Sequence, residues 1–381
     1  MVDDDVKKLP DMTIADLVFL SGLTKDATTT KKLLDEIEKH KMLPLYKKLV
    51  EQLKWKEDSK LIETLKESNE TELKILDEKI TDAETNLGES EIREAYLAKS
   101  DFFCRIGDKD KANQFYRVTF DKTVPLGQRL DVVFTVIRMG IFWMDHDTVT
   151  RNIEKAKTLV EEGGDWDKKN RLKTYEAVYL MSIRKFKEAS ELFLDTLASF
   201  TSTEFIDYNR FVQYLVFTSL LHLDRVSLKS KVIDSPDVLS VIHEIPNLSS
   251  LLVSFYNGDY TQFFKALAHF SDSVKTDRYL GPHAQFLTRE MRILAYTQFL
   301  ESYSSVKLES MSQQFGVSVG FIDRELSRFV AAGRLNCKID KVSGVIETTR
   351  SDVKNSLYKS LIQQGDNLLN RVQKLSRVIN V

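Results

Sequence analysis

Cysteine, glycine and proline are all scarce in this sequence of 381 residues. The two cysteines, Cys104 and Cys337, lie far apart and form no CxxC pair, so neither a disulfide framework nor a zinc site is expected. Only 14 glycines and 6 prolines are present, which suits long helices joined by short turns and disfavours a predominantly β or α/β fold. The composition therefore predicts a mainly α protein with reduced cysteines, of which Cys104 is buried.

A long apolar run is missing as well. No stretch approaches the roughly 18 apolar residues of a membrane span, and the opening MVDDDVKKLP is acidic and lacks the apolar core of a secretion signal. The formal net charge of -2 gives no overall attraction to nucleic acid or to an anionic membrane. We expect a cytoplasmic and nuclear protein that contacts neither membrane nor nucleic acid and has a core large enough for two or three units.

Catalytic and metal-binding motifs are also absent from the sequence. The six histidines are scattered, and the run from His243 to Asn247 (HEIPN) lacks the second histidine of an HExxH zinc motif. There is no HxH pair, no P-loop, no GxSxG elbow and no glycine-rich dinucleotide fingerprint. The sequence predicts a protein that is not an enzyme and has no catalytic, metal-binding or cofactor-binding residues; an enzyme without a recognisable motif is the alternative.

A helix-hairpin pattern recurs in the middle of the chain, where each turn is followed by a small or apolar residue and then by a large apolar one. The clearest copy has its turn at Gly107, its small residue at Ala112 and its large residue at Tyr116. The further copies contain Ile153, Ala156 and Val160, then Phe186, Ala189 and Phe193, then Gly258, Phe263 and Leu267. Successive copies are spaced like one or two tetratricopeptide units. We therefore predict a helical-repeat solenoid over residues 89–300, against the alternative of chance matches among amphipathic helices.

The first 88 residues, 1–88, differ in character from the repeats. Helical patterns cover residues 13–23, 31–55 and 70–87. The last of these helices is strongly charged and has four apolar residues on one face: Leu73, Leu76, Ile80 and Leu87. This heptad-like spacing is too short for a coiled coil, so an ordinary solvated helix is favoured, with a flexible boundary near residues 86–89.

The stretch 301–350 has the pattern of a winged helix. A short helix from Leu308 to Phe315 is followed by a turn at Gly316, and Ser318 is placed to cap a second helix. Gly333 is the expected C-terminal cap of that helix. Four apolar residues share one face of the second helix at the helical period: Val319, Ile322, Leu326 and Phe329.

Two β-rich runs complete the module, at residues 336–340 (NCKID) and 345–348 (VIET). A two-stranded wing leaves backbone groups unpaired along its edges, and a strand from a neighbouring protein could pair with them. The candidate partner-binding residues of this wing are Lys338, Ile339, Asp340, Val345, Ile346 and Glu347. A third strand of the chain itself, near Lys307 and Leu308, is the alternative, and each explanation can hold at one edge.

Charge argues against the DNA-binding role that winged helices often have. Residues 301–350 contain seven Lys or Arg and six Asp or Glu, a balance of only +1. The second helix carries Asp323 and Glu325 beside its arginines, whereas phosphate contact requires an uncompensated positive face. We therefore predict a winged helix that binds proteins, with nucleic-acid binding as the less favoured alternative.

The tail, residues 351–381, is predicted to form an amphipathic helix over 356–378. Five aliphatic residues form an apolar seam along it: Leu361, Leu368, Val372, Leu375 and Ile379. Their burial is worth about 8 to 15 kcal/mol as an upper estimate, whereas association costs about 4 to 15 kcal/mol. A single pair of helices would be marginal, so we predict that the seam joins a bundle of several helices. Folding back onto the chain's own winged helix is the alternative.

A tetratricopeptide-like solenoid that ends in a winged helix resembles the PCI family, found in the proteasome lid, the signalosome and a translation initiation complex. Several segments are similar to one branch of that family, a non-ATPase subunit of the proteasome lid: 87–93 (LGESEIR), 105–109 (RIGDK), 162–166 (EGGDW), 329–335 (FVAAGRL) and 371–380 (RVQKLSRVIN). The resemblance implies a non-catalytic scaffold subunit of the lid of the 26S regulatory particle. Such a subunit supports ubiquitin-dependent protein degradation through PCI–PCI and helical-bundle assembly.

The resemblance also implies partners. These are other PCI-type lid subunits and the deubiquitinating lid subunits, with the ATPase ring as a further neighbour, in a hetero-oligomer. A signalosome PCI subunit is the nearest alternative, and the C-terminal tail favours the proteasome.

Overall fold

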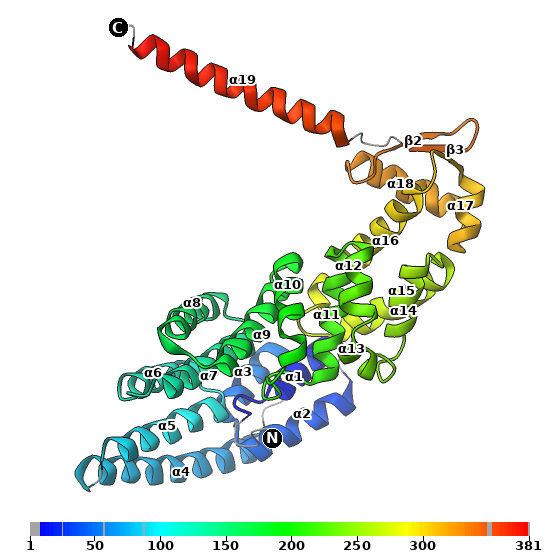
Figure 1. The fold of residues 1–381 in the computed structure, drawn as a ribbon. Coiled ribbons are helices and arrows are strands. Elements are labelled where there is room, and N and C mark those ends of the chain that lie inside the picture. The colour runs from blue at the N-terminus through cyan, green and yellow to red at the C-terminus, as the bar shows by residue number, and fades with distance from the viewer. Residues whose placement is uncertain (1–7, 25, 56–57, 87, 349–352, 380–381) are drawn as a thin grey trace. The chain divides into compact units, whose positions relative to one another are not determined.

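The computed structural model describes residues 8–24, 26–55, 58–86, 88–348 and 353–379, and this part of the chain is mainly helical (Figure 1). The predicted fold class is therefore confirmed. Contacts divide the chain into two compact units, Met1–Leu252 with Ala268–Phe286, and Val253–Leu267 with Leu287–Val381. The division into four regions made from the sequence stays a prediction. Among the described helices, none combines the length and apolar character needed to cross a lipid bilayer.

The first unit consists of helices joined by short turns. Its helices are α1 Met12–Thr24, α2 Ala27–His40, α3 Leu43–Leu53, α4 Ser59–Asn86, α5 Glu89–Ile106, α6 Lys109–Asp121, α7 Leu126–Phe142, α8 His146–Gly163, α9 Trp166–Ser182, α10 Phe186–Thr196, α11 Tyr208–His222, α12 Arg225–Leu228 and α13 Pro236–Val241. Three further helices contribute residues to both units: α14 Leu248–Asn257, α15 Tyr260–Thr276 and α16 Ala284–Glu301.

The predicted repeat corresponds to the helix hairpins α5–α6, α7–α8 and α9–α10. The small residue of each copy, Ala112, Ala156 and Ala189, lies in the second helix and is fully buried. A methyl side chain at this position lets the two helices of a hairpin approach closely. Val160 was expected to be the large buried residue of its copy, but it is only half-buried, and the preceding Leu159 is buried instead.

The N-terminal helices differ from the expectation in two ways. The second helical pattern is divided into α2 and α3, because Lys41 adopts a left-handed conformation with φ 55°. Helix α4 is not an ordinary solvated helix, since Leu73 and Leu76 pack against the core of the first hairpin. The ion pair between Lys99 and Asp77, at 2.5 Å, also joins α5 to α4. These contacts hold α4 against α5 on either side of the predicted boundary at residues 86–89, and Leu87 within that boundary lies outside the described residues.

The second unit contains the predicted winged helix. Its elements are β1 Ser305–Lys307, α17 Leu308–Phe315, α18 Val319–Ala331, β2 Cys337–Asp340, β3 Val345–Thr348 and α19 Val353–Ile379. The three strands form one antiparallel sheet in the order β1-β3-β2. The helices and strands of the module therefore lie where the sequence predicted them, including the third strand that was the alternative for one edge.

The turns around α18 confirm part of the predicted capping. Gly333 has φ +67°, and the next amide donates a 2.9 Å hydrogen bond back to the Phe329 carbonyl, which closes the helix end. Ser318 occupies the N-cap position, but its side chain makes no capping hydrogen bond. Of the four residues predicted to share one face of α18, Ile322, Leu326 and Phe329 are buried, whereas Val319 in the first turn is exposed at 39%.

Candidate functional site

An aromatic cluster in the second unit fixes the winged helix to the helices that precede it. Phe315, at the end of α17, is almost fully buried. Its ring stacks on Tyr260 of α15 at 4.6 Å between centroids, and it also contacts Tyr296 and Phe299 of α16 at 5.0 and 5.4 Å. Phe315 therefore joins α17 to both α15 and α16. These ring contacts stabilise the packing of the winged helix on the rest of its own unit.

A polar contact sets the position of α18. The Glu325 carboxylate accepts a 3.0 Å hydrogen bond from the Tyr296 hydroxyl and forms a 2.9 Å ion pair with Arg292, both on α16. Burial and then the adjacent Glu325 carboxylate raise the pKa of Tyr296, so its hydroxyl remains a donor. The negative charge of Glu325 is therefore neutralised inside the unit. Only 12% of its side chain is exposed.

This contact changes how the surface charge of α18 should be counted. The sequence count treated Asp323 and Glu325 as charges that cancel the helix arginines, but Glu325 is directed towards α16 and Asp323 pairs with Lys341 at 3.4 Å. Arg324 and Arg328 are left exposed on the outer face. Two arginines on one helix do not make the continuous basic stripe that nucleic-acid binding requires. They do make this face mildly cationic.

The sheet corrects one predicted partner-binding site. Strand β3 was expected to offer an open edge at Val345, Ile346 and Glu347, but β1 pairs with one side of it and β2 with the other. The expectation of strand addition at β3 is wrong, because the chain's own Ser305–Lys307 satisfies its second edge. Ile346 is also fully buried.

The outer edge of β2 has no paired strand among the described residues. The amide of Thr348 bonds to the Ser304 carbonyl, so in the antiparallel register the groups of Lys338 and Asp340 point to β3 and those of Ile339 point outwards. The Asp340 carboxylate accepts hydrogen bonds from the Ser343 hydroxyl at 2.6 Å and from the Val342 amide at 2.9 Å. These bonds lower the pKa of Asp340 and fix the turn beside the edge.

Helix α19 carries the second predicted partner-binding surface. The five seam residues are all exposed, by 62% at Leu361, 65% at Leu368, 55% at Val372, 62% at Leu375 and 71% at Ile379. Further exposed apolar side chains, missed by the search at heptad spacing, are Leu357, Tyr358, Ile362, Leu369 and Val378. Most of these lie in a second row beside the first, since each residue advances about 100° around a helix. We call the two rows together the α19 apolar face.

Gly365 lies between these rows and has no atom near the position that a Cβ would occupy. Glycine inside a helix lowers stability by about 0.5 to 1 kcal/mol relative to alanine. Helix stability therefore does not explain a glycine at this position. A notch without a side chain lets a second helix approach closely. The α19 apolar face is therefore broad, with a notch at Gly365.

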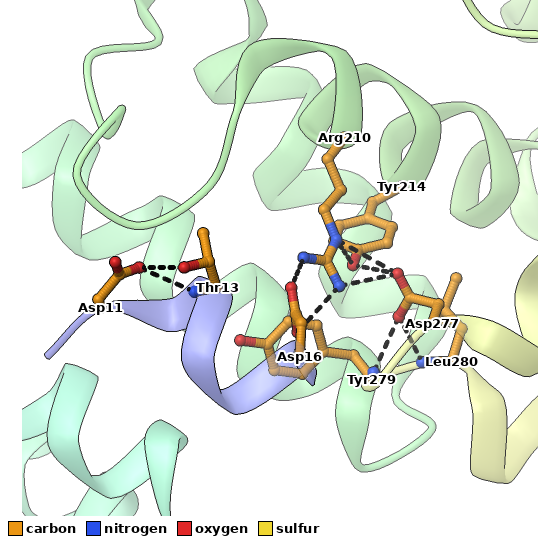
Figure 2. A network of polar contacts seen from close by, with 8 residues as sticks. All are labelled: Asp11, Thr13, Asp16, Arg210, Tyr214, Asp277, Tyr279 and Leu280. Carbon is orange, nitrogen blue, oxygen red and sulfur yellow. Dashed lines mark hydrogen bonds and ion pairs between the residues drawn. The ribbon is translucent and has the colours of Figure 1, made fainter. Parts of the chain in front are cut away.

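A separate polar network stabilises the first unit and connects its N-terminal helix to α11 (Figure 2). The Arg210 guanidinium lies between Asp16 of α1 and Asp277, with 3.0 Å to the latter. Asp277 also accepts a 2.6 Å hydrogen bond from the Tyr214 hydroxyl. Burial alone would lower the pKa of Arg210, but Tyr214 and the two carboxylates outweigh it and raise that pKa. No local pattern in the sequence indicates this network, because Asp16 and Arg210 alone lie 194 residues apart.

Both cysteines are buried, as expected for Cys104, and burial raises the pKa of that thiol to about 12. No set of three His, Cys, Asp or Glu side chains within the described ranges is grouped as metal ligands would be.

Comparison with known proteins adds family evidence over most of the chain. The family model "26S proteasome subunit RPN7" matches residues 58–231, the PCI domain model matches 267–350, and the model of the RPN7/PSMD6 C-terminal helix matches 358–379. The 26S proteasome non-ATPase regulatory subunit 6 of Dictyostelium discoideum is 77% identical over 100% of both chains. The chain belongs to the RPN7 family of 26S proteasome regulatory subunits.

Other RPN7-family relatives are more distant. The Arabidopsis thaliana homologue of non-ATPase regulatory subunit 6 is 55% identical over 92% of this chain and 90% of its own length. Regulatory subunit RPN7 of Saccharomyces cerevisiae is 36% identical over 100% of this chain and 96% of its own. The resemblance inferred from short segments is confirmed, and these names favour the proteasome over the signalosome. The match to the C-terminal helix coincides with the α19 apolar face.

Proposed function

We propose that this RPN7-family chain is a non-catalytic scaffold subunit of the proteasome regulatory particle lid and supports ubiquitin-dependent protein degradation. The observation that carries the proposal is the α19 apolar face, which the described part of the chain leaves exposed although it would stabilise a complex if buried. Membership of a family whose relatives are named regulatory and non-ATPase subunits supports it. The chain would act by positioning other subunits and would have no catalytic step of its own.

The partners proposed are other PCI-type lid subunits, the deubiquitinating lid subunits and the ATPase ring. The location proposed is the cytoplasm and nucleus, where such a particle would work. Within the assembly, the two rows of the α19 apolar face would contact different neighbouring helices. A broad face can bury area against several partners at once, so each added helix strengthens the bundle.

The wing supplies a second proposed contact, now restricted to one edge. We propose that a strand from a neighbouring PCI subunit pairs with the outward groups of β2 at Ile339, while the side chains of Lys338 and Asp340 favour one register. Val345 and Glu347 can take part only through side chains, because their backbone groups bond to β2. Main-chain pairing of this kind gives affinity with little dependence on sequence.

Purification of the tagged chain from cell extract tests the scaffold function. Lid and ATPase subunits are expected among the proteins identified by mass spectrometry, in equal proportions to one another. An untagged extract processed in parallel controls for background. Recovery of the chain without any of these subunits would count against the proposal, and recovery with signalosome subunits would favour the alternative.

Replacement of Ile339 by proline is expected to weaken incorporation while leaving the chain folded. Proline lacks an N–H, and at this position the missing donor is the one that points away from β3. Incorporation can be measured as the fraction of chain that comigrates with the particle on a native gel. The matched control is Ile339→Val, which keeps the N–H and a similar side chain; equal incorporation of both variants would contradict strand pairing at this edge.

A further inference from the structure

A groove of about 210 Å³ opens at the surface of the first unit, where α6, α7 and α8 meet. Its lining includes three cationic side chains, Arg117 from α6 and Arg151 and Lys155 from α8. Phe120 forms part of the wall, and Asn113 adds a side-chain amide. The groove is therefore both cationic and able to donate neutral hydrogen bonds.

The cations of this groove differ from several of their neighbours because, among the described residues, none of them forms an ion pair with a carboxylate. No ion pair among the described residues includes Arg117, Arg151, Lys155 or the adjacent Arg129. By contrast Lys157, also on α8, pairs with Glu176 at 2.6 Å. Arg151 donates only to a backbone carbonyl of its own helix, at 3.3 Å. Three cations thus line the groove and a fourth, Arg129, lies beside it, and none of the four forms an ion pair among the described residues.

Electrostatic repulsion among these neighbouring cations opposes folding. Lys155 places its Nζ 3.3 Å from the centre of the Phe120 ring, and the Arg129 guanidinium lies 5.3 Å from the same ring. Burial lowers the pKa of Lys155; Asp121 opposes this effect, and Arg129 and Arg117 lower the pKa further. For Lys155, burial and the two arginines outweigh the effect of Asp121, so its pKa is lowered. The cation–π contacts stabilise Lys155 and Arg129, whereas neither Arg117 nor Arg151 makes an ion pair or a ring contact among the described residues.

We propose that the groove between α6 and α8 binds a phosphate monoester, carried on a phosphoserine or phosphothreonine side chain of a partner protein. A phosphate has close to two negative charges and three acceptor oxygens, which matches several cations better than a single carboxylate does. Arginines from two facing helices can each offer a planar pair of N–H donors to it. The volume is smaller than the roughly 300 to 1,000 Å³ of a typical small-molecule pocket and suits one such group with its side chain.

This site lies in the first unit and does not depend on α19 or on the β2 edge. It goes beyond the scaffold function, since it makes one contact of the chain dependent on whether a partner is phosphorylated. The proposed scaffold function and the proposed phosphate site can therefore be disproved independently of each other. Loss of the phosphate site would leave the purification of lid partners unchanged.

Fluorescence anisotropy with the full chain tests the proposal. The probes are a labelled peptide of neutral residues with one phosphoserine, the same peptide with serine, and the same peptide with aspartate. The phosphopeptide is expected to bind, the serine peptide not to bind, and the aspartate peptide to bind at least about tenfold more weakly. Binding of the phosphopeptide should also weaken as salt is raised.

Variants locate the binding in the groove. Arg151→Gln and Lys155→Gln are each expected to weaken phosphopeptide binding about tenfold, because each removes a charge-assisted contact. Lys157→Gln removes the same charge from the same helix outside the groove and should leave binding unchanged. Lys155→Arg keeps the charge and should bind nearly as well as the parent, even if Lys155→Gln disturbs packing on Phe120.

Four results would overturn the proposal. They are no binding of the phosphopeptide, equal binding of the aspartate peptide, an equal effect of Lys157→Gln, and binding of inorganic phosphate as tight as that of the phosphopeptide. The last would mean that the groove recognises free phosphate and gains nothing from a protein that carries it. Equal binding of the aspartate peptide would instead indicate that the groove binds an acidic segment of a partner without phosphorylation.

Discussion

A chain ended after Asp352 is expected to keep both compact units folded while losing nearly all incorporation into the regulatory particle. The described residues of α19 bury none of their large apolar side chains, so their removal takes no packing from the remaining chain. In an assembly, however, the same side chains would supply most of the bundle contact. Even the five seam residues alone are worth more than the roughly 1.4 kcal/mol that corresponds to a tenfold change in affinity.

Thermal unfolding of the purified truncated chain and its comigration with the particle measure the two halves of this prediction. Two full-length double variants then test whether incorporation depends on the α19 apolar face itself or only on the presence of the helix. Leu361→Ser with Leu368→Ser should reduce incorporation, whereas Lys359→Ser with Lys374→Ser, on the same helix outside the α19 apolar face, should not. Normal incorporation of the truncated chain would exclude the bundle.

Arg210→Ala is expected to lower the free energy of unfolding by about 3 to 5 kcal/mol, the range for breaking a buried ion pair at one partner. Arg210 has 26% of its side chain exposed, and Asp277 has 15%, so water can replace the lost contact only in part. The variant would leave two carboxylates and the Tyr214 hydroxyl without their shared cation. Helix α1 would also lose its ion pair through Asp16.

Urea unfolding followed by circular dichroism measures this loss. Arg151→Ala is the control, because it shortens an exposed arginine that forms no ion pair, and it should change stability by less than about 0.5 kcal/mol. Asp16→Asn should have an intermediate effect, since Arg210 keeps Asp277. If Arg210→Ala were as stable as the control, the network would contribute little to the free energy of unfolding.

The features that could be predicted from the sequence are those with local signals. The ends of α17 and α18 follow from Gly316 and Gly333, which adopt the left-handed conformation that glycine favours. The alanines of the repeat were found because a small residue recurs at a spacing set by the hairpin. The five seam residues of α19 were found by their period, and they are all exposed in the separate chain.

Features that depend on distant parts of the chain could not be predicted with the same certainty. The pairing of β1 with β3 brings together segments about 40 residues apart, so the closed edge at Val345 to Glu347 had only a weak sequence signal. The sequence of helix α4 suggests a solvated helix because many of its residues are charged, yet Leu73 and Leu76 pack on the first hairpin. The cationic groove was missed since its side chains come from separate helices and no motif links them.

The uncovered face of α19 also bears on how copies of this chain are made and kept. A newly synthesised copy that has not yet assembled exposes an apolar helix. Chaperones bind proteins with such exposed apolar surface, and proteases degrade those that stay unassembled. The abundance of this chain in a cell should then follow whichever neighbour is in shortest supply, with any surplus aggregating or being degraded. The helix proposed to hold this chain in the particle would therefore also limit the lifetime of an unassembled copy.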